Sequence, residues 1–103
     1  MILVLSTVAS EKDARKIART LVEERLAACG TVVPGATSVY RWEGKVEENG
    51  ESLLLLKARK EDWIPLRDRL SSLHPYDTPE IVSIPASGVS EKYAAWMRAQ
   101  TSR

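Results

Sequence analysis

The residue best suited to chemistry in this sequence is His74, the only histidine of the chain. It lies in the stretch SLHPYDTPEIVSIPA, from Ser72 to Ala86, which holds three of the five prolines. An imidazole can bind a transition metal or transfer a proton near neutral pH. A cation near a helix C-terminus is also stabilised by the helix dipole, and prolines commonly follow helix ends. We expect the His74 ring to cap the last turn of a helix, and metal binding is the alternative.

Catalytic patterns are absent from the sequence. A serine nucleophile needs an adjacent base, and His74 is the only imidazole available. Asp77 is its only close partner in the sequence, and no nucleophile-elbow motif accompanies them. The chain also lacks the glycine fingerprints of Walker and dinucleotide-binding loops. We predict that the protein is not an enzyme and requires no cofactor.

Cys29 is the only cysteine, which excludes an internal disulfide and a cysteine-built zinc site. A single free thiol fits a reducing cytosol, so we expect a cytoplasmic protein. Because Cys29 follows a helical pattern, we expect it to be a small core residue, with contact to a metal as the less favoured alternative.

Length and charge restrict the class of protein. The 103 residues correspond to one domain, 1–103, and the net charge is +1 without a run of five like charges. No nucleic-acid partner is therefore indicated.

The opening segment MILVLSTVAS has an apolar run too short for a secretory signal or a membrane span, and it is better interpreted as a strand.

Apolar periodicity predicts seven elements. Helical spacing and the N-cap residues Ser10 and Ser90 define the helices, while branched apolar runs define the strands. The expected elements are a strand at Ile2–Val8, a helix from Glu11 to about Ala28, a strand at Thr31–Trp42, a strand at Glu51–Arg59, a helix at Glu61–Leu73, a strand at Glu80–Pro85 and a last helix after Ser90. This order predicts an α+β, ferredoxin-like βαββαβ sandwich with an extended β-hairpin and an added C-terminal helix.

Two turns compete for the tip of the hairpin. Asn49-Gly50 is the stronger signal because both residue types tolerate the positive φ of a type I′ turn. We therefore expect the tip there and a bulge at Gly44, with a second bulge or kink at Pro34-Gly35.

The strands are too apolar for a sheet with one face in water. Residues 2–5 and 53–56 are apolar at every position, so both faces need cover. A second copy of the chain is the cover we expect, with Tyr40, Trp42, Leu54 and Leu56 at the interface. The alternative is a monomer whose hairpin folds back over its own sheet.

Four segments together resemble the CutA family of divalent-cation tolerance proteins. They are ERLAAC at Glu24–Cys29, PGATSVYRWEGK at Pro34–Lys45, HPYDTPEI at His74–Ile81 and KYAAWM at Lys92–Met97. The resemblance implies a ferredoxin-like protomer in a homotrimer built through the extended hairpin, and a link to tolerance of copper and other divalent metals. Such a trimer is similar to those of PII-type signalling proteins, which suggests a small-molecule sensor as the alternative function.

The resemblance also implies a set of metal ligands that this chain only partly retains. Copper-binding members offer a cysteine and a paired histidine where this chain has Ser6 and Leu73, which leaves His74 and Glu80. We expect these two residues to bind copper(II) or another divalent cation weakly.

The likeness to PII-type trimers further suggests Arg25, Tyr76 and Asp77 as residues of an intersubunit cleft, with Glu80 as a possible neighbour. Glu47, Glu48 and Glu51 are instead expected to form a solvated charged turn at the hairpin tip.

Overall fold

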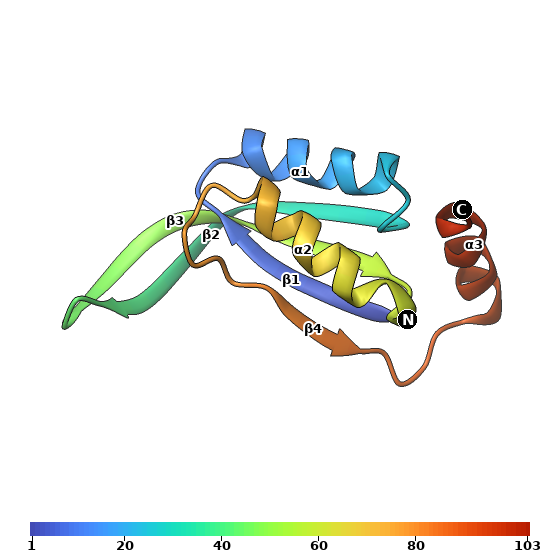
Figure 1. The fold of residues 1–103 in the computed structure, drawn as a ribbon. Helices are drawn as coiled ribbons and strands as arrows, with labels where there is room; N and C mark the ends of the chain where they lie inside the picture. Colours follow the sequence, from blue (N-terminus) through green and yellow to red (C-terminus); the bar gives the residue numbers. More distant parts are fainter.

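The computed structural model describes residues 1–103 as a four-stranded antiparallel sheet covered on one face by two helices (Figure 1). The elements are β1 (Ile2–Val8), α1 (Glu11–Glu23), β2 (Cys29–Trp42), β3 (Lys45–Ala58), a 3-10 turn (Lys60–Asp62), α2 (Trp63–Leu73), β4 (Val82–Pro85) and α3 (Glu91–Thr101). The strands lie in the order β2-β3-β1-β4. The predicted ferredoxin-like α+β fold is confirmed, including the long β2–β3 hairpin and the added helix α3.

Helix α1 begins where the sequence predicts but ends five residues earlier. The Ser10 hydroxyl accepts a hydrogen bond from the Asp13 amide at 3.2 Å, which caps the first turn. At the other end Arg25 adopts a positive φ of 61°, and the amides of Arg25 and Leu26 donate to the carbonyls of Val22 and Leu21 at 3.0 Å. This is a Schellman ending, with an arginine in the left-handed position that glycine usually occupies. The predicted helix end near residue 28 was wrong because the apolar spacing continues past this turn.

The hairpin tip lies at Glu43-Gly44, and the prediction of a tip at Asn49-Gly50 was wrong. Glu43 and Gly44 have φ values of 49° and 79°, and Trp42 pairs with Lys45 across them. Asn49 and Gly50 instead pair with residues of β2 in the middle of the ribbon. The local preference of Asn-Gly yields to the register of two 14-residue strands. The predicted irregularity at Pro34-Gly35 is present as a register shift between Val33 and Ala36.

The remaining boundaries differ by small amounts. Strand β4 begins at Val82, two residues later than predicted, and a 3-10 turn precedes α2. Ser90 occupies the N-cap position of α3, although its hydroxyl makes no capping bond.

The core lies between the sheet and the two helices α1 and α2. Alternation in β1 and β3 turns Val4, Ser6, Leu54 and Leu56 toward the helices, where each is 0% exposed. Leu54 and Leu56 were expected at an interface between chains. That expectation requires correction, because both leucines belong to the hydrophobic core of a single chain.

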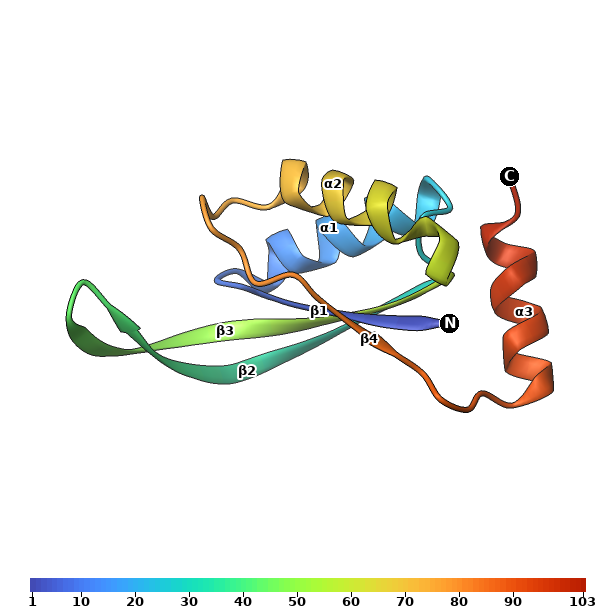
Figure 2. The same cartoon turned by 60° about the horizontal axis from the view of Figure 1, so that its bottom comes forward.

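The other face of the sheet carries a second apolar surface. Leu5 pairs with Leu55 and Thr7 with Leu53, and these side chains are only partly buried. Val33, Val82 and Ile84 lie in register on the same face, 42%, 46% and 41% exposed. We call this surface the open face, defined as Leu3, Leu5, Val33, Leu53, Leu55, Val82 and Ile84. Neither α1 nor α2 covers it (Figure 2).

The outer half of the hairpin projects beyond the two-layer body and stretches the molecule to 45 × 25 × 23 Å (Figure 2). Its two strands contact each other there and no helix covers them. None of the three helices is long and apolar enough to cross a membrane.

Candidate functional site

His74 lies where α2 ends, and its ring joins that helix end to strand β1. The backbone amide of His74 closes the helix by donating to the Leu70 carbonyl at 3.0 Å, and the chain then turns extended toward Pro75. The ring accepts at Nδ1 from the Tyr76 amide at 3.1 Å. The proton therefore resides on Nε2, which donates to the Thr7 carbonyl at 3.0 Å. The prediction that the ring caps the last turn of α2 was wrong, because the ring bonds to a strand and a loop while the backbone amide of His74 closes the helix.

Burial lowers the pKa of His74, although the Thr7 carbonyl and the charge of Glu51 act in the opposite direction. The residue is only 7% exposed, so the charged form of the ring loses most of its hydration. The ring is consequently neutral at neutral pH, and both of its nitrogens are already engaged.

A second polar residue, Glu51, anchors the same region. The Tyr76 hydroxyl donates to Glu51 Oε2 at 2.6 Å. Burial raises the pKa of the Glu51 carboxyl, but hydrogen bonds from Ser38, Tyr76 and Thr7 outweigh it and the pKa is lowered. We name Thr7, Ser38, Glu51, His74 and Tyr76 the Glu51 cluster. It lies at the point where the open face continues into the projecting hairpin.

Burial and the neighbouring Glu51 carboxylate raise the pKa of Tyr76 to about 12. The phenol is thus held as a proton donor and Glu51 as an acceptor over the whole neutral range. An ionised carboxylate that accepts hydrogen bonds from several hydroxyl groups holds their segments together strongly, because each of these hydrogen bonds is assisted by charge.

Sequence reasoning placed Glu51 in a solvated turn, which was wrong because the hairpin tip lies elsewhere. The sequence did contain a signal for the actual position of Glu51. Glu51 shares the period-two alternation of Leu53 and Leu55, so it is an acidic residue at an open-face position of an otherwise apolar strand.

The predicted metal ligands do not form a site in one chain. Three or more histidine, cysteine, aspartate or glutamate side chains nowhere converge as a metal would require. A metal on His74 would have to displace either the Tyr76 amide or the Thr7 carbonyl. Glu80 is exposed just before β4, and Ser6 is buried with its hydroxyl unpaired. Metal binding by His74 and Glu80 stays a prediction.

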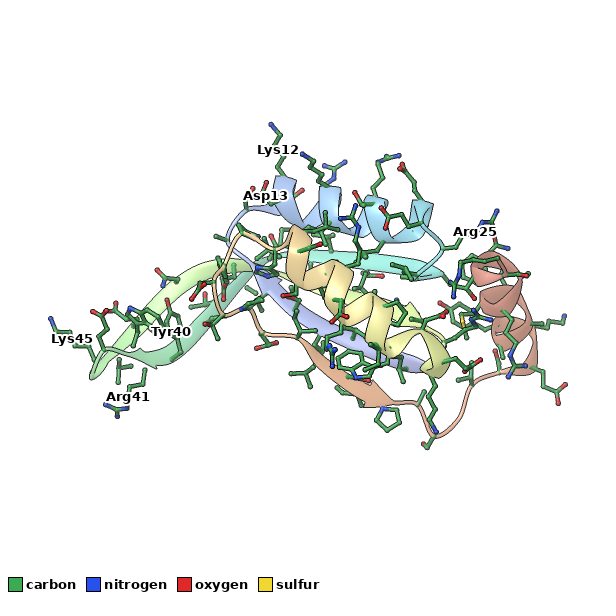
Figure 3. The ribbon with its side chains drawn as sticks, in the orientation of Figure 1. Lys12, Asp13, Arg25, Tyr40, Arg41 and Lys45 are labelled. Atoms are coloured by element: carbon green, nitrogen blue, oxygen red, sulfur yellow. The ribbon has the colours of Figure 1, made fainter.

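The residues suggested for a cleft do not meet within one chain. Arg25 lies near α3, where its guanidinium donates to the carbonyls of Gln100 and Ser102 at 3.3 Å. Figure 3 shows Arg25 and Tyr40 at opposite ends of the molecule. Tyr76 lies at the Tyr40 end, because the two phenols are close enough for Tyr40 to contribute to the raised pKa of Tyr76. Asp77 is exposed in the loop that follows.

The predicted aromatic interface residues are available to a partner. Tyr40 and Trp42 are 40% and 58% exposed on the hairpin.

Cys29 is only partly buried, against the expectation of a core residue, and its thiol lies 3.8 Å from the Lys57 ammonium.

The split βαβ topology, with two helices on one face of an antiparallel sheet, defines a ferredoxin-like α+β protein. Within that class the chain belongs to the family of the CutA1 divalent ion tolerance protein, whose model matches residues 2–100. The resemblance inferred from the sequence is thereby confirmed.

Individual relatives agree with this assignment. The divalent-cation tolerance protein CutA of Thermus thermophilus is 51% identical over 98 residues, which are 95% of each chain. Human Protein CutA is 40% identical over 92% of this chain, and the chloroplastic CutA of Arabidopsis thaliana is 42% identical over 97%. The chain spans about half the length of these two relatives, 53% and 55%.

Solved structures give the same result for the fold. The Thermus thermophilus protein superposes with a TM-score of 0.93 at 50% identity over 98% of this chain and 99% of the other. The CutA1 structure from Pyrococcus horikoshii superposes with a TM-score of 0.95 at 38% identity over the whole of both chains. The family is described by tolerance of divalent ions and not by a reaction.

Proposed function

We propose that this protein takes part in tolerance of divalent metal ions, as a non-enzymatic module that acts as a homotrimer. The family description and the names of the relatives support the first part. The observation that carries the second part is the open face, which no element of the chain covers fully.

The open face is too apolar for a surface that stays in water. Covering a large aliphatic side chain contributes about 1.5–3 kcal/mol, and Val33, Val82 and Ile84 each keep two fifths or more of their surface exposed. The surface continues into Tyr40 and Trp42 on the projecting hairpin. The occupant we propose is a second copy of the chain, with hairpins that reach across to neighbouring protomers.

A matched pair of substitutions tests this assembly. Ile84→Asp places a charge on the open face, whereas Ile64→Asp places one on the solvent side of α2, where the side chain is 51% exposed. In light scattering we expect the wild-type protein and Ile64→Asp to have three times the chain mass of 11.5 kDa, and Ile84→Asp to have a lower mass. A wild-type mass near 11.5 kDa would rule out the assembly.

Copper(II) or another divalent cation would bind weakly, through His74 and Glu80 in the assembled protein. The weakness follows from the two existing bonds of the His74 ring, one of which a metal must replace. Calorimetric titration with copper(II) of the wild type, His74→Ala and Glu80→Gln tests the assignment, with Glu91→Gln at the exposed start of α3 as the control. Equal affinity in all four proteins would remove both residues from the site.

A small-molecule sensor is the second candidate, and the Glu51 cluster favours it. A polar cluster at the end of an apolar face would become a polar pocket wall once a second chain packs beside it. A thermal-shift screen of nucleotides, organic anions and metals separates the two functions. A shift with an organic compound that is lost in Glu51→Gln, together with none from metals, would favour the sensor.

The cytoplasmic location inferred from the single cysteine stays a prediction. Two plant relatives are named as chloroplastic, and one solved relative from Archaeoglobus fulgidus is named as periplasmic.

A further inference from the structure

Helix α3 is attached to the rest of the protein differently from the other helices. Its buried residues are Met97 and Thr101, and neither belongs to the 13-residue hydrophobic core. The core is formed by the sheet, α1 and α2 without any contribution from α3. In Figure 2 the helix stands beside the end of the sheet and not over either of its faces. Its removal would therefore leave the core of the protein closed.

The loop 86–90 connects α3 to β4 and can serve as a hinge. Its first residue is fixed, because the Ala86 amide donates to the Met1 carbonyl at 3.0 Å. Gly88 follows in an open position, where even an added Cβ would meet no atom within 4 Å. Ser90 then begins the helix without a side-chain cap.

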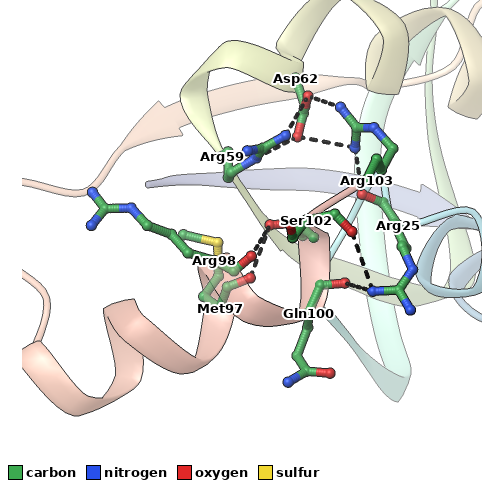
Figure 4. Close-up of polar contacts among 9 residues, drawn as sticks. Arg25, Arg59, Asp62, Met97, Arg98, Gln100, Ser102 and Arg103 are labelled. Carbon is green, nitrogen blue, oxygen red and sulfur yellow. Dashed lines mark hydrogen bonds and ion pairs between the residues drawn. The ribbon is translucent and has the colours of Figure 1, made fainter.

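The far end of α3 is held by a reciprocal pair of arginines (Figure 4). Arg25, at the end of α1, donates to the Gln100 and Ser102 carbonyls. Arg103 in turn donates to the Arg25 carbonyl at 2.8 Å and to the Asp62 carboxylate at 2.5 Å. We call Arg25, Asp62 and Arg103 the arginine clasp. Arg103 thus bonds to the backbone of Arg25 itself, and Arg25 bonds to the backbone just before Arg103.

Asp62 is the fixed point of the clasp. Its side chain is 4% exposed, and Arg59 donates to it at 2.9 Å from within the same turn. Asp62 is thus paired even when Arg103 departs. The Arg103 side chain, by contrast, is 41% exposed, so its guanidinium has water available as a substitute partner. The clasp can open without stranding a buried charge, which would otherwise carry a large penalty.

Helix α3 lies beside the only thiol of the chain. Tyr93, in the first turn of α3, lies near Cys29 at the start of β2, and burial together with this thiol raises the pKa of the Tyr93 hydroxyl. The Lys57 ammonium lies 3.8 Å from Cys29 Sγ and 3.0 Å from Thr31 Oγ1. The helix also contacts β3, the strand that carries Lys57.

We propose that α3 is a hinged strap that opens while the sheet stays folded, that the arginine clasp sets how often it opens, and that opening uncovers Cys29 and Lys57. The strap goes beyond the proposed metal and assembly functions, since it involves neither His74 nor the open-face leucines. Local opening of this kind is expected where few apolar contacts hold an element.

Cys29 supplies a built-in reporter of the opening. We expect reaction with an aromatic disulfide reagent to be about tenfold faster or more in Arg103→Gln than in the wild type, because hydrogen bonds to a buried carboxylate are lost. Arg98→Gln is the matched control, since Arg98 is an exposed residue of the same helix and Figure 4 shows no contact from its guanidinium. Equal rates in all three proteins, or equal acceleration in both variants, would overturn the proposal.

Urea and hydrogen exchange separate strap opening from global unfolding. If α3 opens alone, the labelling rate should change little in low urea, because little surface becomes exposed. Amides in α3 should exchange faster than those in β1, and Arg103→Gln should accelerate only the α3 amides. A labelling rate that follows the global unfolding constant, or α3 amides protected as strongly as β1, would overturn the proposal.

Discussion

The bond between Tyr76 and Glu51 provides the most quantitative test of the candidate site. Tyr76→Phe removes the hydroxyl that donates to Glu51 Oε2 at 2.6 Å while the ring stays in place. A hydrogen bond to a charged group contributes about 1.5–3 kcal/mol in well-buried examples. Both side chains keep part of their surface in solvent, so we expect a coupling energy below that range, about 1 kcal/mol.

The coupling should depend on pH at both extremes. The folded state holds the Tyr76 proton to about pH 12 against an ordinary pKa of 10.0, so this stability is complete below pH 10 and is lost as the pH rises through that window. The Glu51 pKa is lowered from 4.5, so its contribution is present above that value and is lost as the pH falls through the folded pKa. Tyr76→Phe lacks the alkaline loss.

A double-mutant cycle with Tyr76→Phe, Glu51→Gln and the double variant isolates the pair. Urea unfolding at pH 7 and at pH 11 gives the four free energies of unfolding at each pH, and one fixed protein concentration keeps the contribution of assembly comparable. A coupling below about 0.3 kcal/mol at pH 7, or one that is unchanged at pH 11, would contradict the assigned hydrogen bond.

Three further predictions concern the fold. Gly30→Ala should lower the free energy of unfolding measured in urea by about 1–3 kcal/mol, because the added Cβ would lie 2.9 Å from the Cβ of Ala18. In the control variant Gly50→Ala the added Cβ meets nothing within 4 Å, and the free energy of unfolding should change by less than about 0.5 kcal/mol. Glu43→Asn should raise the free energy of unfolding by about 0.5–1 kcal/mol, and with it the thermal midpoint, since asparagine tolerates the positive φ of 49° better than glutamate does. An unchanged or lower midpoint would contradict the assigned turn. The wild-type protein should lose stability as the pH falls below about 6.5, because the folded state lowers the pKa of His74, and His74→Gln should remove that part of the slope; the same slope in both proteins would refute the neutral ring.

The sequence predicted those parts of the fold that depend on local pattern and composition. The boundaries of β1, the Ser10 cap and the irregularity at Pro34-Gly35 all follow from a few neighbouring residues. The end of α1 could not be predicted, because Arg25 adopts a left-handed backbone conformation that arginine rarely adopts. The competition between two turns was likewise decided by strand register across the sheet, which no local signal contains.

The candidate site was predicted only in part for a similar reason. His74 was identifiable because histidine occurs once, and Tyr76 because it lies in the same segment. Glu51, Ser38 and Thr7 come from three different strands, and only the folded register brings them together. The face occupied by each leucine of the 53–56 run was also undetermined, since a continuous apolar run carries no alternation from which a face can be assigned.

The projecting hairpin and the two-layer body are expected to differ in local stability. Residues 39–46 form a two-stranded ribbon without a core of their own, and such ribbons are marginally stable in water. The ribbon therefore frays long before the sheet unfolds, and a protease should cut at the tip and leave the two-layer body intact. In the proposed homotrimer, the neighbouring protomer that contacts the ribbon must also order it, so we expect dilution to loosen the hairpin and higher protein concentration to stiffen it. The rigidity of the hairpin would then report how much of the protein is assembled.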